Sequence, residues 1–182
     1  MIHIYFGEGK GKTTAAVGLA VRAAGRGRRV IFAQFLKGRE TGEIAPLEKL
    51  GVKIIRSGKE KDCFSWEMTE EQKAAYRIVQ AELLGKVKEA VCGGEQRIDQ
   101  NADQADLLVL DEVLNAISEE HDLLDVEALK SFLETKPKTL EIVLTGRPAP
   151  QWLTAKADYV TEMKKHKHPY DSGTGAREAI EF

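Results

Sequence analysis

The chain has 182 residues, 42% of them hydrophobic, so it can bury one sizeable core and is expected to form a single domain over residues 1–182. Its 27 basic and 29 acidic residues give a net charge of −2, which offers no general attraction for nucleic acid or an anionic membrane. No apolar run approaches the ~18 residues of a membrane span and no signal-like segment precedes the first strand, so we expect a cytoplasmic protein. Cys63 and Cys92 lack a Cys-x-x-Cys spacing, so reduced thiols are expected.

A glycine-rich stretch follows the first predicted strand. The apolar run Ile2–Phe6 leads into Gly7-Glu8-Gly9-Lys10-Gly11-Lys12-Thr13-Thr14, after which a helical pattern begins. Glycines let successive backbone N–H groups turn toward one point, the helix adds its positive end, and Lys12 adds a mobile charge. Thr13 supplies a hydroxyl where Mg²⁺ would bind. The stretch therefore predicts a cradle for nucleotide phosphates, with an ordinary Gly-rich turn as the alternative.

The loop departs from the usual pattern Gly-x-x-x-x-Gly-Lys-Ser/Thr, because Phe6 stands where that pattern has its first glycine. Small residues at helical spacing then predict a helix that packs closely on a sheet and ends near Gly25 and Gly27.

Residues Arg28–Phe35 predict a buried parallel strand, because their apolar core is continuous rather than alternating. Four site candidates lie at or beyond its end: Gln34, Lys37, Gly38 and Arg39. Functional groups of parallel sheets gather beyond the carboxyl ends of strands, so these residues should face the glycine loop. For Lys37 and Arg39 a solvated loop is the alternative.

The middle of the chain combines regular elements with one unusual loop. A short helix, a third strand and a long amphipathic helix that starts at a capping box are predicted over Glu43–Leu50, Val52–Ile55 and Thr69–Cys92. The loop between the last two contains Phe64 and Trp66. These aromatic side chains either anchor the loop or present a surface to a flat apolar ligand.

Leu107–Glu112 is the second informative stretch, with four aliphatic residues before Asp111 and Glu112. A strand of this kind next to the first strand would bring these carboxylates within reach of Mg²⁺ held by Thr13. Alone, the pattern often marks only a helix cap after a strand. Combined with the glycine loop, it predicts a nucleotide and metal site.

The last part of the chain continues the alternation of helices and strands. A helix, a strand, one or two helical turns and a last strand are predicted over Asp125–Thr135, Leu140–Pro148, Ala149–Ala155 and Tyr159–Met163. Arg147 lies at a carboxyl end, whereas His166 and His168 alternate with lysines in a spacing that disfavours metal binding. The whole pattern predicts an α/β fold, P-loop NTPase-like and RecA-like, with a mostly parallel sheet and helices on both faces.

In this order, several blocks resemble the P-loop type of ATP:corrinoid adenosyltransferase over the whole chain. The blocks are residues 7–14, 34–38, 108–112, 143–147, 159–163, 168–170 and 180–182. In that family the loop also lacks the first glycine. The resemblance implies that ATP donates its 5′-deoxyadenosyl group to the Co(I) of a corrinoid such as cobalamin, with triphosphate as the leaving group.

The resemblance also implies roles for individual residues. Lys12 and the loop amides would bind triphosphate, and Thr13, Glu112 and the nearby Asp111 would hold Mg²⁺. The residues implied in binding ATP are Gly7, Glu8, Gly9, Lys10, Gly11, Lys12, Thr13, Thr14, Gln34, Lys37 and Arg147. Phe64 and Trp66 would displace the lower axial ligand of cob(II)alamin, which eases its reduction by a donor such as reduced flavodoxin. Relatives suggest a homodimer.

Two departures limit this comparison. The chain begins at its first strand, without the N-terminal extension of some relatives, and Ala179 replaces a glycine common near the C-terminus. The rival enzyme is a nucleoside kinase or ATPase, which shares the loop and the acidic strand but transfers the γ-phosphoryl group. The rival outside catalysis is a carrier that binds corrinoid or nucleotide without chemistry.

Overall fold

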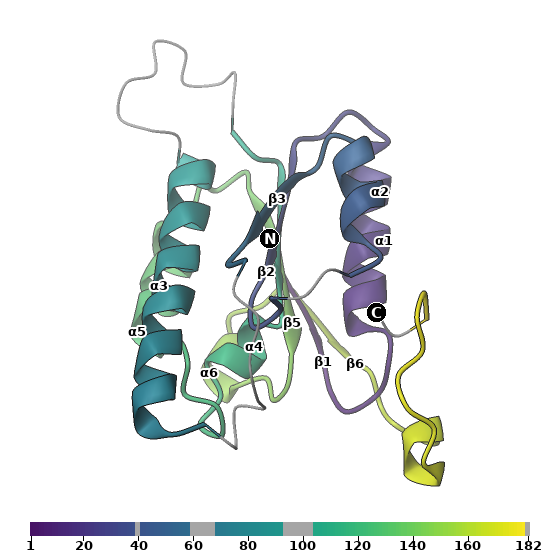
Figure 1. Ribbon diagram of the computed structural model, residues 1–182. Helices are drawn as coiled ribbons and strands as arrows, with labels where there is room; N and C mark the ends of the chain where they lie inside the picture. The colour runs from purple at the N-terminus through teal and green to yellow at the C-terminus, as the bar shows by residue number, and fades with distance from the viewer. Residues whose placement is uncertain (39–40, 59–67, 93–103, 181–182) are drawn as a thin grey trace.

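The structure, a computed structural model, describes residues 1–38, 41–58, 68–92 and 104–180. Within these ranges a single parallel sheet has the strand order β3-β2-β4-β5-β1-β6 (Figure 1). Its strands are β1 (Ile2–Phe6), β2 (Val30–Gln34), β3 (Lys53–Arg56), β4 (Leu107–Asp111), β5 (Glu141–Gly146) and β6 (Tyr159–Glu162). Every pairing in it is parallel, so the predicted α/β fold of the P-loop NTPase-like kind is confirmed, with a sheet more uniform than expected.

Helices cover both faces of the sheet, as Figure 1 shows. One face carries α1 (Lys12–Ala24) and α2 (Ile44–Lys49). The other carries α3 (Glu70–Cys92), α4 (Val113–Ala116), α5 (Val126–Thr135) and α6 (Gln151–Thr154). A 3₁₀ turn, η2 (Pro169–Ser172), follows β6. The short α4 and η2 were not predicted from the sequence.

Each central strand divides its side chains between two apolar layers. In β2, Val30 and Phe32 pack on the side of α1 and α2, whereas Ile31 and Ala33 pack on the side of α3. Successive strand residues point to opposite faces, and both faces are covered, so the strand reads as a continuous apolar run. The prediction of a buried parallel strand is confirmed, with its ends at Val30 and Gln34.

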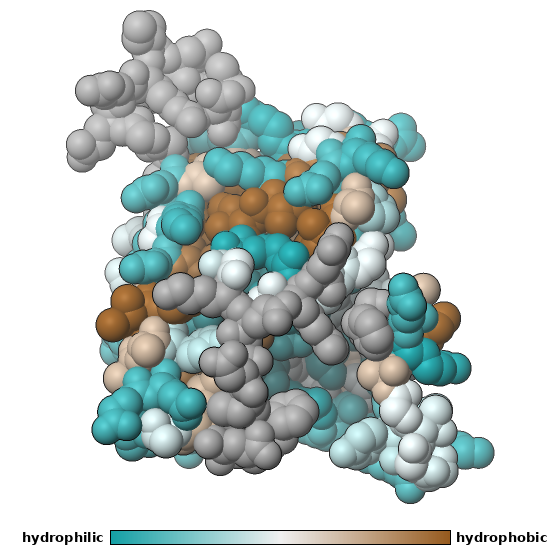
Figure 2. All heavy atoms as spheres, viewed as in Figure 1, coloured by the Kyte–Doolittle hydropathy of each residue, from teal (hydrophilic) through white to brown (hydrophobic). Residues whose placement is uncertain are grey.

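The long helix α3 begins where its capping box predicts. Thr69 N–H donates to Gln72 Oε1 at 2.8 Å, and Gln72 N–H donates to Thr69 Oγ1 at 3.3 Å. Its apolar stripe is buried against the sheet, with Val79, Leu83, Val87 and Val91 among the core residues. Figure 2 shows apolar side chains between α3 and the α1/α2 pair, over the edge strand β3, with hydrophilic side chains around them.

The strand that carries Asp111 does not lie next to β1, because β5 pairs with both β1 and β4. The expectation of adjacent strands was therefore wrong. Thr13 still reaches this strand, since α1 packs across β4 and β5. Within the described ranges, no helix has the length and apolar character needed to cross a membrane.

Candidate nucleotide site

The loop between β1 and α1 is shaped by its glycines. Gly7 and Gly11 have φ values of 107° and 109°, in the region that strains any other residue. Gly9 is needed for space: its N–H donates to Met163 O at 2.5 Å, and a Cβ on it would lie 2.6 Å from the same oxygen. The backbone that follows β6 therefore packs directly on the loop.

Lys12 lies in the first turn of α1 with its ammonium over the loop. Its Nζ donates to Gly7 O at 2.6 Å and to Gly9 O at 2.7 Å. Burial, and then the positive charge of Arg147, lower the pKa of Lys12 below its usual value. A cation in such surroundings gains from contact with phosphate oxygens, because their charge offsets both effects.

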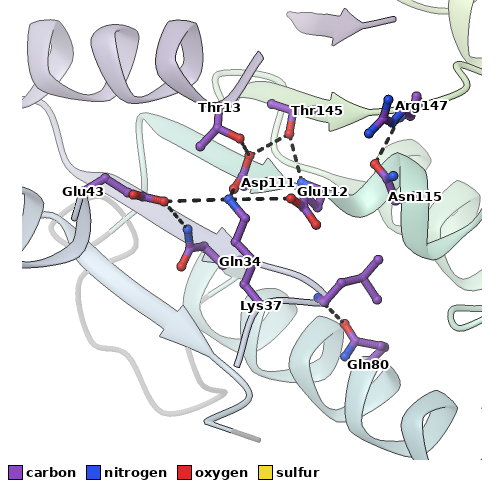
Figure 3. Close-up of polar contacts among 11 residues, drawn as sticks. Thr13, Gln34, Lys37, Glu43, Gln80, Asp111, Glu112, Asn115, Thr145 and Arg147 are labelled. Carbon is purple, nitrogen blue, oxygen red and sulfur yellow. Dashed lines mark hydrogen bonds and ion pairs between the residues drawn. The ribbon is translucent and has the colours of Figure 1, made fainter. Parts of the chain in front are cut away.

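Asp111, at the end of β4, is fully buried and joins three elements (Figure 3). Its Oδ1 accepts hydrogen bonds from Thr13 Oγ1 at 2.8 Å and from Thr145 Oγ1 at 2.7 Å. Its Oδ2 accepts one from Lys37 Nζ at 2.8 Å. The loop helix, β4 and β5 thus meet at one carboxylate. The sequence predicted that Thr13 and Asp111 lie close together, but not the contact with Thr145.

Glu112 follows in a left-handed conformation, with φ 60°. Its backbone N–H donates to Thr145 Oγ1 at 2.9 Å, and its Oε1 lies 3.7 Å from Lys37 Nζ. A residue other than glycine is uncommon in this region of φ and is held there only by surrounding contacts. The turn gives the two adjacent acids different settings, with Asp111 fully buried and the Glu112 side chain 35% exposed.

Lys37 lies among the carboxylates. Its Nζ is 2.8 Å from Asp111 Oδ2, 3.7 Å from Glu112 Oε1 and 3.8 Å from Glu43 Oε1. Burial by itself lowers the pKa of Lys37, but the charges of Asp111 and then Glu112 outweigh it and raise the pKa above its usual value. Gln34 Nε2 donates to Glu43 Oε1 at 2.7 Å, so the predicted Gln34 and Lys37 both belong to this cluster.

The donor set at the end of β4 suits a Mg²⁺ ion that a phosphate also binds. Within the described ranges, no group of three or more His, Cys, Asp or Glu side chains is placed to hold a metal ion alone. The Thr13 hydroxyl, bonded to Asp111, and the neighbouring Glu112 offer hard oxygen atoms on one side. Mg²⁺ is commonly bound by one or two carboxylates with substrate phosphates and water, which matches this arrangement.

Arg147, beyond β5, faces the loop. Its Nη1 donates to Glu8 Oε2 at 2.5 Å, which joins two of the predicted site residues. Its N–H donates to Asn115 Oδ1 at 3.1 Å. Gly146, with φ 136°, leaves room for this contact, because a Cβ there would lie 2.4 Å from the same Asn115 oxygen.

Several other predicted site residues are not part of the contacts around Asp111, or lie outside the described ranges. Lys10 Nζ donates to Ile180 O at 2.9 Å, and Thr14 is exposed on α1. Neither takes part in the contacts around Asp111 described above. The predictions for four more residues fall outside the described ranges: Arg39, Cys63, Phe64 and Trp66.

A basic cleft of about 430 Å³ lies beside the loop. Gly9 and Lys10 form its wall on the loop side, and the rest comes from Lys164, Lys165, His166, Lys167, His168, Pro169 and Arg177. Lys165 pairs with Asp171 at 3.0 Å. The positive charge that the overall balance lacks is therefore concentrated locally next to the loop.

Sequence reasoning missed three residues that position the site. They are Glu43, Asn115 and Thr145, which contact Lys37, Arg147 and Asp111 respectively. Thr145 lies in the block of residues 143–147, at the end of a predicted strand. That position at a strand's carboxyl end was the signal that could have identified it. Glu43 and Asn115 occupy a helix cap and a helix, where nothing local marks them.

Comparison with known proteins was made over the whole chain. A family model described as ATP:corrinoid adenosyltransferase BtuR/CobO/CobP matches residues 1–182. A protein of Sinorhizobium sp named corrinoid adenosyltransferase is 35% identical over 185 residues, covering 100% of this chain and 80% of the relative. Proteins of the same name from Pseudomonas aeruginosa and Escherichia coli K12 are 31% and 30% identical, covering 98% and 100% of this chain and 82% and 85% of theirs.

Proposed function

Because the chain belongs to the ATP:corrinoid adenosyltransferase family, we propose that it transfers the 5′-deoxyadenosyl group of ATP to the Co(I) centre of a corrinoid and releases triphosphate. The family match over residues 1–182 carries this proposal. The glycine loop, linked to Asp111 through Thr13, supports it, because a triphosphate leaving group needs both a phosphate cradle and a metal-binding acid. The product would serve the synthesis or salvage of adenosylated corrinoids.

The proposed reaction is a displacement at C5′ of the ribose. The Co(I) electron pair forms the new cobalt–carbon bond, the C5′–O bond breaks, and triphosphate departs with that bond's electron pair. Co(I) in a corrinoid is itself a strong nucleophile, so no side chain has to be activated for attack. The protein has to position the two substrates and stabilise charge on the departing oxygen.

Residues of the glycine loop would hold the leaving group. Lys12 donates to the Gly7 and Gly9 oxygens and would donate to a phosphate seated in the loop. The N-terminus of α1 adds its partial positive charge at the same place. Arg147 pairs with Glu8 of the loop, and Lys37 lies beside Asp111 at the end of β4. Both would add positive charge near the triphosphate.

We further propose that Mg²⁺ accompanies ATP. Thr13, Glu112 and, directly or through water, Asp111 would hold it next to the loop. When bound, Mg²⁺ neutralises phosphate charge and so stabilises triphosphate as a leaving group. The Thr13–Asp111 hydrogen bond supports this role, because it orients the hydroxyl at the first turn of α1.

The test is incubation of the protein with ATP, Mg²⁺ and chemically reduced cobalamin, followed by identification of both products. Adenosylcobalamin with an equal amount of triphosphate supports the proposal. ADP would instead indicate the kinase or ATPase reading, which the family match does not favour. Adenosylated product that stops at one equivalent per protein would indicate a carrier.

For Phe64 and Trp66, which lie outside the described residues, the proposal remains that they displace the lower axial ligand of cob(II)alamin. The double variant Phe64→Ala, Trp66→Ala should then lose activity when a reduced flavodoxin-like donor must reduce Co(II) on the protein. It should retain most activity with pre-reduced Co(I), which needs no such help. Equal losses in the two assays would make these residues anchors of their loop.

We also make proposals about the oligomeric state and the location of the protein. We propose that it forms a homodimer, which sedimentation of the purified chain would test. We also propose a cytoplasmic location, which fractionation of cells would test.

A further inference from the structure

Lys37 lies among several carboxylates whose negative charges need a cation nearby. Its ammonium lies within 3.8 Å of carboxylate oxygens from three residues, Asp111, Glu112 and Glu43. Figure 3 shows these carboxylates converging on Nζ from different elements. The Lys37 side chain is 20% exposed and that of Asp111 is fully buried, so water screens their attraction only in part.

The chain fixes Lys37 there by an unusual turn. Leu36 has φ 59°, a conformation that costs a residue other than glycine free energy. Its N–H donates to Oε1 of the fully buried Gln80 on α3 at 3.3 Å, and the preceding Phe35 N–H donates to Asp111 O at 2.9 Å. A strained turn held from two sides indicates that the direction of Lys37 matters.

Thr13, Glu112 and Asp111 are the residues proposed to hold Mg²⁺. Two of them, Asp111 and Glu112, also supply carboxylates around Lys37. A divalent ion that approaches these carboxylates would be repelled by the ammonium. The lysine stem has four rotatable carbons, so Nζ can swing away when a better partner is offered. A triphosphate in the adjacent loop is such a partner, because it carries several negative charges.

We propose that Lys37 is an internal counter-ion that excludes divalent metal from the acidic pair until the nucleotide arrives, and then moves to the triphosphate as the metal enters. This inference rests on the proposed use of Mg²⁺ with ATP. Metal binding and nucleotide binding would thereby be coupled. The metal ion replaces the Lys37 ammonium at the carboxylates, and the triphosphate gives that ammonium a new anionic partner. The empty enzyme would keep its buried acid neutralised, and the loaded enzyme would bring one more cation to the leaving group.

The test is binding of Mn²⁺ alone, without nucleotide or corrinoid, followed by electron paramagnetic resonance. Lys37→Met, which keeps the length of the stem and removes the charge, should bind Mn²⁺ at least about tenfold more tightly than the unaltered chain. Lys37→Arg keeps a cation and should not bind more tightly. Lys138→Met removes an equal charge from an exposed position and should match the unaltered chain.

Thermal unfolding gives a second readout that does not depend on turnover. Lys37→Met leaves buried carboxylate charge uncompensated, so its unfolding temperature should fall, and millimolar Mg²⁺ alone should raise it again. Equal Mn²⁺ affinity in Lys37→Met and the unaltered chain would overturn the proposal. So would a Lys37→Met protein whose instability is unaffected by divalent ions. Both measurements stand if adenosyl transfer itself is not found, so failure of one proposal is separate from failure of the other.

Discussion

The site is built by two regions at strand ends, and each region is held together in a different way. At the end of β4, charged and hydroxyl side chains converge on Asp111, which accepts hydrogen bonds from three residues. At the ends of β1 and β6, backbone meets backbone, with Gly9 N–H bonded to Met163 O and no space for a side chain. The first region should therefore be sensitive to loss of charge, and the second to added volume.

Asp111→Asn should give the largest effect on stability. It keeps the shape of the side chain but removes the charge that balances the largely buried Lys37, and breaking such a pair costs about 3–5 kcal/mol. Urea unfolding would measure the loss. Glu119→Gln, at an exposed position just beyond α4, is the control and should change little. A loss of stability below about 1 kcal/mol would show that charge pairing at Asp111 contributes little to the stability of this region.

Lys12→Ala should reduce adenosyl transfer by about 10²-fold or more at saturating ATP, because the loop then lacks its strong positive group. The fold should survive, since Lys12 is half-buried and, among the described residues, its Nζ donates to carbonyls of its own loop. Circular dichroism and steady-state rates separate the two effects. Activity above about a tenth of the original would remove Lys12 from the proposed role.

Gly9→Ala tests the backbone region. Its Cβ would lie 2.6 Å from Met163 O and 2.8 Å from Met163 C, atoms that cannot turn away as a side chain can. The strain should cost about 1–3 kcal/mol and should weaken ATP binding as the loop shifts. Gly18→Ala, in α1 with open space around its Cβ, is the matched control and should stabilise the protein slightly. Unchanged ATP affinity in Gly9→Ala would show that this contact does not shape the loop.

Glu112→Gln tests whether Glu112 serves mainly to bind metal while Asp111 serves mainly stability. Because Glu112 is part-exposed, losing its charge should leave stability nearly unchanged and raise the Mg²⁺ concentration needed for half-maximal activity about tenfold. Binding of ATP without metal should stay the same. Titration of Mg²⁺ at fixed ATP measures this effect. A silent Glu112→Gln would leave Asp111 as the principal metal residue.

Ala179→Gly should have the smallest effect. Ala179 has φ 63°, which glycine adopts without strain, so the substitution should stabilise the C-terminal segment by about 0.5 kcal/mol. That segment touches the loop through the Ile180 carbonyl and Lys10. Slower amide exchange over residues 176–180 would report it. Ala176→Gly, at a position without positive φ, is the control and should have the opposite effect.

The site residues that were predicted share one property, which is a local signal. The glycine loop, Asp111 and Glu112 each follow an apolar run, and their residue types state their chemistry. Lys37 and Gln34 were found for a similar reason, because the carboxyl ends of parallel strands meet at one edge of the sheet. The α/β fold with helices on both faces followed from the alternation of strand and helix patterns.

What could not be predicted depends on which distant elements meet. The contact of Gly9 with Met163 requires β6 to pair with β1, and the Thr145–Asp111 bond requires β5 to lie between β1 and β4. Strand order is decided by packing of the whole sheet, so local patterns do not report it. The same reason explains why β4 was expected next to β1 and why Asn115 was missed.

In the proposed reaction the C5′–O bond of ATP breaks and triphosphate leaves. This step can be followed with ATP labelled with ¹⁸O at the oxygen bridging C5′ and the α-phosphorus, with Mg²⁺ and chemically reduced cobalamin as the other reactants. We expect all of the label in triphosphate and none in the adenosylated corrinoid. Label that stays with a nucleoside diphosphate would contradict it, because the phosphoryl group would then have been transferred instead.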